Sequence, residues 1–489
     1  MAQQSITAHT LSQTALPQGN QLQKGSLGLW SIIFFVIAAA SPLTGVVGGL
    51  PVAFMAGNGA GVPGVYVLAG ALLLIFSFGF IAMSRYVVNA GAFYAYIAQG
   101  LGTHSGIAGL GIALLAYTAI QLAVTAMFGF FFAQFVQMHT GVVAPWWLFS
   151  LLMQAAVVAL GIAKVELGGK VLGVLMLMEV GIVLLVDAAI VTQPIAFDIS
   201  AFAPSTVFHG DVGIAMIFAI CSFVGFEATA IYSEECRQPA KIIPRATLLA
   251  VVLITSFFAL SGWAFVQYAG AANVAELAAK DPGMFVFTVT EQVLGPWAIQ
   301  VMSVLLITSL FAATQAFHNT LSRYLFAISR DGLLWSKMAK THRTHQTPYI
   351  ASLVQGAFML CATALFALAQ LDPMANVFSW ASALGSMSIL VLQFSVSLAV
   401  LAYFQRNPSL PVSRWSRLIA PALSALGMLA TLALVVNNLD VLSGSSSPVV
   451  SSLPYLVLMV AFSGFMSAHF LRRLSPERYS RIGQIVETL

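Results

Sequence analysis

Two long apolar segments of the sequence are interrupted near their middles by residues that disfavour a continuous helix. The first segment, residues 28–55, is interrupted at residues 41–45, which read Ser-Pro-Leu-Thr-Gly. The second, residues 211–232, is interrupted at residues 223–227, which read Phe-Val-Gly-Phe-Glu. Proline supplies no backbone donor, and glycine permits turns that other residues avoid. Each interruption is therefore expected to leave backbone N–H or C=O groups free to bind a ligand.

The free backbone groups at the two breaks have opposite polarity. After the first break, the amides of Gly45, Val46 and Val47 are predicted to face the gap and favour an anion. Before the second break, the carbonyl groups near Ser222 and Phe223 favour a cation. A zwitterionic amino acid fits both ends without contacting a charged side chain. The predicted substrate-binding residues are Ser41, Leu43, Thr44, Gly45, Val46, Cys221, Ser222, Phe223, Val224, Gly225 and Phe226. A packing kink is the alternative for the first break alone, since Gly and Pro are frequent in membrane helices.

Acidic side chains inside apolar segments form a second group of candidates. A carboxylate at membrane depth costs about 2.5–3.5 kcal/mol on insertion scales, so it needs a partner, water or a function. Burial disfavours the charged form of a carboxyl group, so Glu179 could bind and release a proton or hold a cation. A purely structural acid is the alternative. The predicted coupling residues are Glu179, Glu227, Thr308 and Ser309, with H⁺ or Na⁺ as the coupling ion.

Three further residues are weaker candidates. Asp187 lies about two turns beyond Glu179 and is expected to be solvated near the outer face. His318 suits proton coupling by its chemistry, but a hydrogen-bonded packing role is the stronger interpretation. Trp380 could reach the side-chain pocket. The sequence contains neither a His-Glu-x-x-His cluster nor a P-loop, so it predicts no catalytic residue, no metal site and no cofactor, and it argues against an ATP-driven pump.

The composition excludes a soluble globular protein. Of 489 residues, 59% are hydrophobic and only 7% are charged, whereas soluble domains carry about 25% charged residues. Twelve apolar stretches are long enough to span a bilayer at about 20 residues each. The predicted spans are residues 28–55, 64–84, 104–137, 146–163, 169–192, 210–232, 246–270, 292–318, 349–369, 376–402, 418–437 and 452–471.

The basic residues predict the orientation of these spans. Of the 20 Lys and Arg residues, all but Lys280 fall on or beside the even-numbered loops or the tails. Cytosolic loops carry the excess of Lys and Arg, so both termini are predicted to be cytosolic in a multi-pass protein of the cytoplasmic membrane. The net charge of +4 is explained by topology and indicates no nucleic-acid partner. Residues 1–25 lack an apolar core and are interpreted as a cytosolic tail without a signal peptide.

The order of the spans predicts two halves of five spans each. The predicted units are a tail at 1–25, a first repeat at 26–193, an external linker at 194–210, a second repeat at 211–403, two additional spans at 404–472 and a tail at 473–489. Each repeat opens on an interrupted span. Residues 85–101 and 271–291 occupy equivalent positions and are predicted to form short interfacial helices, with ordinary amphipathic loops as the alternative. Paired broken helices indicate a transporter with a midplane substrate site.

Three stretches resemble the amino acid–polyamine–organocation superfamily. The sequence FVGFEATAIYSEECRQPAKIIPRA, within residues 210–246, resembles the family's sixth span and the loop that follows it. Residues 323–348 are similar to the loop after the eighth span, with Trp335 in place of the usual proline, and residues 85–102 are similar to the loop after the second. The resemblance covers about residues 28–403 and implies the leucine-transporter fold with an amino acid or related amine as substrate. It also implies that Glu179 lies where many members carry a lysine that replaces a sodium ion.

Three functions remain open at this point. The leading hypothesis is a secondary transporter of an amino acid that works by alternating access, coupled to protons or exchanging substrates. A polyamine or organic-amine carrier is the alternative, and it would depend on Glu179 and Glu227 because a polyamine has no carboxylate. A nutrient receptor without transport would keep the same site. Membrane lipid is an expected partner, and the sequence does not specify the substrate or the oligomeric state.

Overall fold

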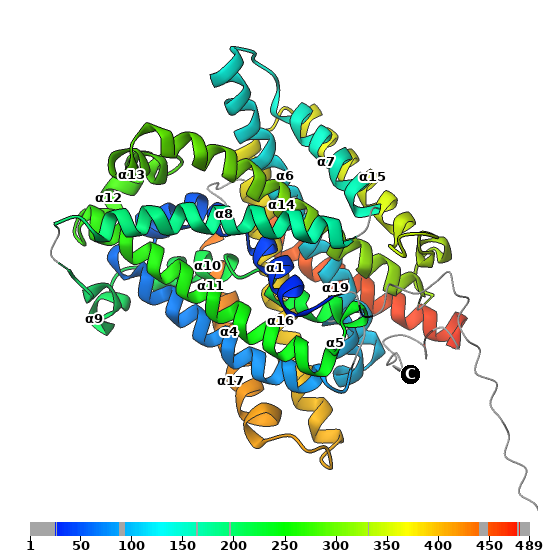
Figure 1. The fold of residues 1–489 in the computed structure, drawn as a ribbon. Helices are drawn as coiled ribbons and strands as arrows, with labels where there is room; N and C mark the ends of the chain where they lie inside the picture. The colour runs from blue at the N-terminus through cyan, green and yellow to red at the C-terminus, as the bar shows by residue number, and fades with distance from the viewer. Residues whose placement is uncertain are drawn as a thin grey trace, which may run out of the picture.

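The computed structural model of this chain describes residues 25, 27–87, 93–162, 165–194, 197–330, 332–439, 448–476 and 479. These residues form helices and their connections, with a single isolated bridge between Leu27 and Cys236. Within these described ranges, ten helices are long and apolar enough to cross a membrane. The all-helical membrane fold is therefore confirmed (Figure 1). The count of twelve spans stays a prediction, because the fourth predicted span forms a helix of 17 residues and the sixth is broken.

The first five predicted spans correspond to consecutive helical elements. The first is broken into several pieces, and the other four are single helices. Their bounds are α1 Leu29–Ala40, α2 Pro42–Thr44, a π-helix Gly45–Gly49 and α3 Leu50–Ala56, then α4 Val62–Ser84, α6 Thr103–Thr140, α7 Trp146–Ile162 and α8 Val165–Val191. The 38 residues of α6 and the 35 of α14 in the second half exceed the roughly 20 that a bilayer requires.

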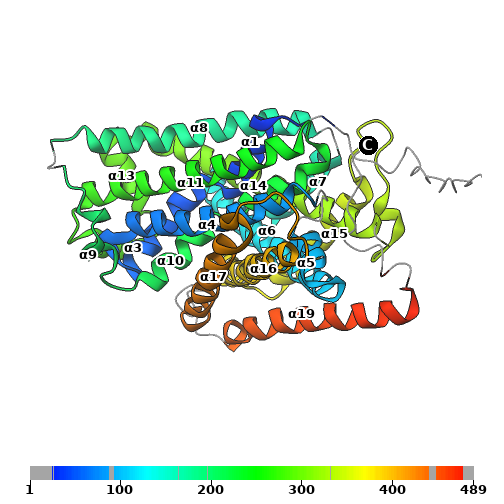
Figure 2. The same ribbon diagram turned by 90° about the horizontal axis from the view of Figure 1, so that it is seen from below.

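The second half repeats this pattern of one broken element followed by four helices. Its bounds are α10 Val212–Cys221 with a 3₁₀ segment η5 Phe226–Glu235, α11 Pro239–Ala269, α14 Pro296–Arg330, α15 Tyr349–Leu368 and α16 Ser379–Arg406. Two further helices follow, α17 Ala420–Asn437 and α19 Pro448–Leu474. Figure 2 shows α8 along one side of the bundle and α19 along the opposite side. The predicted boundaries between the two repeats remain predictions.

The two broken elements lie beside each other at both of their ends. Leu27, before α1, accepts a hydrogen bond from the Arg237 amide and donates one to the Glu235 carbonyl, both at 3.1 Å. We call the side of the bundle that carries these contacts the terminal face. At the opposite face, the Asp211 amide donates to the Gly57 carbonyl at 3.4 Å. The two breaks therefore lie between the same pair of faces, near the middle of the bundle.

Short helices occur in both loops for which they were predicted. Between α4 and α6 lies α5, Phe93–Leu101, and between α11 and α14 lie α12, Val274–Lys280, and α13, Phe285–Leu294. Residues 93–98 of α5 are buried against the bundle, so this helix is an integral part of the core. The preceding Gly91-Ala92 pair, residues 1–24 and most of the predicted C-terminal tail lie outside the described residues.

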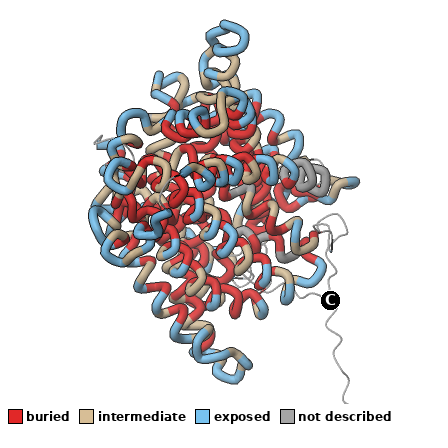
Figure 3. The backbone as a smooth tube through the Cα atoms, turned by 60° about the vertical axis from the view of Figure 1, so that its left-hand side comes forward, coloured by how far each residue is buried: buried red, intermediate tan, exposed pale blue. Residues whose placement is uncertain are grey.

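The core is a continuous mass of apolar side chains between the helices. Figure 3 shows buried backbone through the centre of the molecule and exposed backbone toward the periphery. Large apolar side chains are also exposed on the outer faces of α8, α11, α17 and α19, where Leu177 is 57% and Leu426 is 66% exposed. Such surfaces are compatible with a hydrocarbon environment and incompatible with water over so large an area.

Candidate functional site

The first break is produced by Ser41, whose backbone adopts φ 46°, in the left-handed region. Pro42 then begins α2, where its missing N–H group is no loss. Gly45 donates its amide to the Ser41 carbonyl at 3.0 Å. The expectation that the Gly45 amide is free for a ligand is therefore wrong, because the second half-helix begins one turn earlier than predicted. The amide of Leu43 in α2 lies next to Glu179 instead.

A chain of hydroxyl groups connects the first break to a buried carboxyl group. The Ser41 hydroxyl donates to Thr44 Oγ1 at 2.6 Å and lies 2.8 Å from Ser309 Oγ of α14. Ser309 donates in turn to Oε2 of Glu179 on α8. The Glu179 side chain is fully buried, and its Oε1 has no hydrogen-bond partner within normal geometry among the described residues. Three elements thus converge on one carboxyl group that has spare acceptor capacity.

The second break is held by Gly225 and Glu227. Gly225 has φ 108°, a conformation that side-chain-bearing residues rarely adopt, and it ends the short turn after α10. Its amide donates to Glu227 Oε2 at 3.1 Å, while the Tyr117 hydroxyl of α6 donates to Oε1 at 3.0 Å. Both oxygens of Glu227 are therefore occupied by structural donors, and this side chain fixes the shape of the break.

A cavity of about 290 Å³ lies between the two breaks. Six predicted residues line it, namely Ser41, Thr44, Gly45, Cys221, Ser222 and Val224. The side chains of Leu43, Val46, Phe223 and Phe226 are buried in the surrounding core, and Gly225 contributes the turn. No Asp, Glu, Lys, Arg or His is among the described residues that line the cavity. Its wall is apolar, with hydroxyl groups and helix ends as its polar groups.

Much of the cavity wall comes from residues that sequence reasoning missed. These are Ile120, Ala123 and Val124 of α6, Phe317 of α14, Phe378 before α16, and Ser379, Ser382 and Ser386 of α16. Ser386 Oγ lies 2.8 Å from the Cys221 sulfur at the second break. The three serines are spaced i, i+3 and i+7, which places them on one helix face. That spacing was a usable signal for a polar stripe facing the cavity.

The remaining candidates have different surroundings from those expected. Thr308 donates its hydroxyl to the Leu305 carbonyl of its own helix at 2.9 Å, so only its neighbour Ser309 reaches Glu179. His318 Nε2 is 2.7 Å from Ser352 Oγ on α15 in a buried contact. The expectation that Asp187 is solvated is wrong: it is 3% exposed, because Ser261 of α11 covers it and donates to Oδ2 at 2.7 Å. Trp380 does not line the cavity.

An aromatic wall separates the cavity from the outside of the bundle. The Phe258 ring of α11 stacks on the Tyr66 ring of α4 with centroids 5.1 Å apart, and the Tyr66 hydroxyl is 3.0 Å from Ser222 Oγ. A Cβ atom on Gly45 would lie 2.5 Å from this Phe258 ring, whereas one on Gly48 would meet only Met127 Cε, at 3.5 Å. A side chain at Gly45 would therefore displace the wall, and a side chain at Gly48 would enter the cavity.

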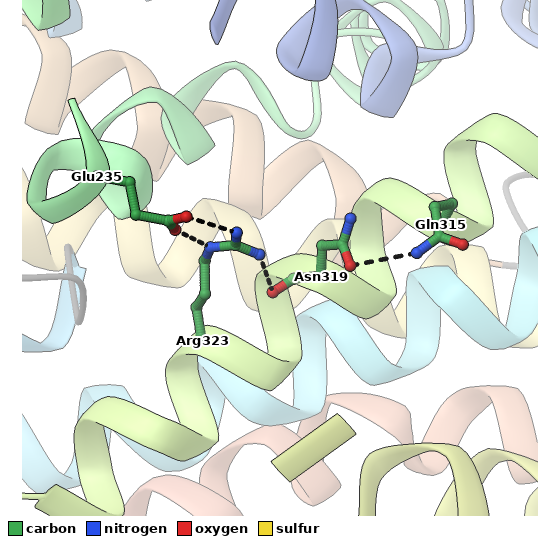
Figure 4. A network of polar contacts seen from close by, with 4 residues as sticks. All are labelled: Glu235, Gln315, Asn319 and Arg323. Atoms are coloured by element: carbon green, nitrogen blue, oxygen red, sulfur yellow. Dashed lines mark hydrogen bonds and ion pairs between the residues drawn. The ribbon is translucent and has the colours of Figure 1, made fainter. Parts of the chain in front are cut away.

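A buried ion pair closes the terminal face beneath the cavity. Arg323 of α14 donates through Nε and Nη2 to the two carboxylate oxygens of Glu235, and its Nη1 donates to the Asn319 carbonyl at 3.2 Å (Figure 4). The side chains are 1% and 4% exposed. The guanidinium also lies 4.9 Å from the Tyr232 ring centroid, and that ring stacks on Phe35 of α1 at 5.1 Å. Arg323 therefore joins both broken elements to α14.

Two broken membrane helices around a central cavity define the architecture of a membrane transporter. The model of the amino acid permease family matches residues 31–472, so the chain belongs to this family.

Several curated proteins are similar to the chain at low identity. The branched-chain amino acid permease BcaP of Bacillus subtilis is 26% identical over 234 residues, covering 47% of this chain and 46% of that protein. The L-lysine transport protein of Corynebacterium glutamicum is 25% identical over 347 residues, covering 68% and 66%. The Asc-type amino acid transporter 1 of Homo sapiens is 24% identical over 311 residues, covering 59% and 56%. The chain thus spans less than two thirds of each of these relatives.

Proposed function

We propose that the protein is a secondary transporter that carries an amino acid with an uncharged, apolar side chain across the cytoplasmic membrane by alternating access. The observation that carries this proposal is the cavity, which joins two helix breaks and has no charged side chain among its described lining residues. The substrate carboxylate would lie at the first break, beside Ser41 and Thr44, and its ammonium group at the C-terminal end of α10. Apolar residues such as Val124, Phe317 and Phe378 would surround the side chain.

The cavity disfavours the polyamine alternative. A polyamine requires acidic partners for each ammonium group, and a desolvated charge without a partner is costly. Glu179 lies behind the hydroxyl chain of Ser41 and Ser309, and both oxygens of Glu227 are already hydrogen-bonded. Neither carboxylate reaches the cavity surface. One relative is named for branched-chain amino acids and another for L-lysine. Membership of the family therefore does not define which side chain the substrate carries.

Uptake into proteoliposomes tests the proposed substrate class. Purified protein should accumulate radiolabelled leucine, and unlabelled valine or isoleucine should compete because their side chains fit the same apolar wall. Leucinamide and isopentylamine lack the carboxylate and should compete poorly, as should putrescine. Putrescine accumulation without leucine accumulation would establish the amine carrier instead. Binding of leucine without accumulation would establish a receptor.

Coupling is proposed to run through Glu179, with H⁺ or Na⁺ as the ion. Glu179 is connected by Ser309 and Ser41 to the break that would hold the substrate carboxylate. The Glu179 carboxyl group can accept a proton, and its oxygens together with these hydroxyl oxygens are the hard ligands that a small cation uses. A change of charge at Glu179 would therefore be felt at the first break. The fully occupied oxygens of Glu227 make it the weaker coupling candidate.

We propose that the elements that meet at the terminal face move apart in the alternating-access step. Met55 and Phe378 line the cavity on the side away from the terminal face, and Met55 is 40% exposed. The Arg323–Glu235 pair closes the other side. Release toward the terminal face would then require this ion pair and the Leu27 backbone contacts to open together.

The orientation in the membrane is proposed from the sorting of basic residues, with the terminal face toward the cytosol. Phe202 and Lys340 lie in loops on opposite sides of the predicted topology, and both are exposed. On a background lacking native cysteines, Phe202→Cys should react with an impermeant thiol reagent in intact cells, and Lys340→Cys should not. Reaction at position 340 in sealed cells would reverse this orientation.

A further inference from the structure

A second cavity lies on the outside of the bundle, between α1, α8 and α11. It has a volume of about 360 Å³, within the range of ligand pockets at about 300–1,000 Å³. Every described residue that lines it is apolar except Ser256. Trp30, Leu177 and Leu253 at its rim are 61%, 57% and 40% exposed. We call this cavity the α1–α8–α11 groove.

The groove lies on the outer surface of three candidate membrane spans, those that contain α1, α8 and α11. Its rim is continuous with other exposed apolar side chains of α8 and α11, including Val174, Met178, Leu185 and Val252. A water-filled groove with this lining would be unfavourable, because apolar surface is stabilised by removal from water. In a bilayer the groove is in direct contact with acyl chains. Hydrocarbon is therefore the occupant whose chemistry matches the lining.

A basic side chain lies where the headgroup of such a lipid would be. Arg245, Leu249, Leu253 and Leu260 are spaced at i, i+4, i+8 and i+15 on α11, so they follow one face of the helix. Arg245 is exposed and has no ion-pair partner among the described residues. At 1.5 Å per residue it lies about 12 Å from Leu253 toward the terminal face. A guanidinium at that height is placed to bind a phosphate oxygen.

We infer that the α1–α8–α11 groove is a binding site for a phospholipid, with one acyl chain in the apolar groove and the headgroup phosphate on Arg245. The groove is separated from the substrate cavity by a thin wall. Pro42 and Phe258 line the groove, and the Phe258 ring packs against Gly45 at the first break. An acyl chain in the groove would therefore contact the Phe258 ring, which packs against the first break. Binding of the lipid does not depend on the proposed transport function.

Fluorescence quenching by phospholipids with brominated acyl chains tests the site, because Trp30 lines the groove. The full-length protein in detergent is titrated with brominated phosphatidylglycerol, and the same titration is made with W30F. We expect a saturable quenching component in the unaltered protein that W30F lacks. Equal saturable quenching in both proteins would place the lipid elsewhere and overturn the inference.

Groove-filling variants test the position of the acyl chain, and a substitution at Arg245 tests the position of the headgroup. Ser256→Phe and Val180→Phe add bulk from two different helices and should remove the saturable component, while Leu426→Phe on exposed α17 should retain it. Arg245→Gln should weaken phosphatidylglycerol binding about fivefold, the loss expected for one basic residue near anionic lipid. Unchanged quenching in both filled variants would overturn the acyl-chain site. A brominated fatty acid that binds as tightly as the phospholipid, with Arg245→Gln without effect, would overturn the phospholipid assignment.

Discussion

Substitution of Glu179 by glutamine should separate substrate exchange from driven uptake. The amide keeps the size of the side chain and can still accept the Ser309 hydrogen bond, so the first break should keep its shape. It cannot take up a proton or balance a cation. In proteoliposomes, the unaltered protein should accumulate leucine faster as the external pH falls, or as sodium is added. Glu179→Gln should exchange internal for external leucine at a similar rate and lose this dependence.

The neighbouring acid Asp187 provides the matched control for this experiment. It is buried on the same helix two turns away, but its hydrogen-bond partner is Ser261 of α11, and among the described residues it forms no hydrogen bond to either break. Asp187→Asn should therefore retain the pH or sodium dependence of uptake. If Glu179→Gln keeps that dependence too, Glu179 is a structural acid, and His318 and Glu227 become the candidates to test.

Substitution of Glu235 by glutamine should open the terminal face. Removal of one partner from a buried ion pair leaves an uncompensated charge and costs about 3–5 kcal/mol. Here that cost falls on the state in which Arg323 is enclosed with Glu235 and Tyr232. We therefore expect Glu235→Gln to favour the conformation in which Arg323 reaches water. Concentrative uptake should fall sharply, because the terminal face would no longer stay closed while the opposite side of the cavity is open.

The native Cys236 reports on this opening. It is 6% exposed beside Leu27, and burial raises the pKa of its thiol, so alkylation in the closed state should be slow. With Cys221 and Cys361 replaced by serine, Glu235→Gln should accelerate the alkylation of Cys236. Joint replacement of Glu235 and Arg323 by leucine and methionine removes both charges and should restore slow labelling. The exposed Lys280–Glu276 pair is the control, since Glu276→Gln should leave the labelling rate unchanged. Equal rates in all variants would show that the ion pair does not control this face.

The two breaks could be predicted from sequence because their causes are local. Pro42 removes a backbone donor and Gly225 permits a turn at positive φ, so both mark possible breaks within an apolar span. Glu227 is a visible candidate because a carboxylate at membrane depth is costly. The register of the first break was less predictable. Ser41 adopts the left-handed conformation and lets α2 begin at Pro42, which consumes the Gly45 amide. Local sequence does not distinguish these two starting points.

The cavity wall and the partners of the acids depend on tertiary packing. Along the middle of α6 most residues are apolar, so the sequence does not indicate which face carries Ile120 and Val124 into the cavity. Thr308 and Ser309 are adjacent in sequence, yet only Ser309 points at Glu179, because successive residues on a helix face different directions. Asp187 was placed in solvent from its position near a helix end, and only the packing of α11 reveals that Ser261 covers it.

The most direct test of the proposed substrate site compares two glycines in apolar spans. A side chain at Gly48 enters the cavity and otherwise meets only Met127, whereas one at Gly181 of α8 meets nothing within 4 Å. The leucine affinity of purified Gly48→Val and Gly181→Val is measured by scintillation proximity. The comparison distinguishes a filled substrate cavity from a general effect of valine on folding. We expect Gly48→Val to lose about tenfold or more, since one methylene in an apolar pocket changes binding by about 1–3 kcal/mol. Gly181→Val should bind leucine normally. Normal leucine affinity in a folded Gly48→Val protein would contradict the assignment of this cavity as the substrate site.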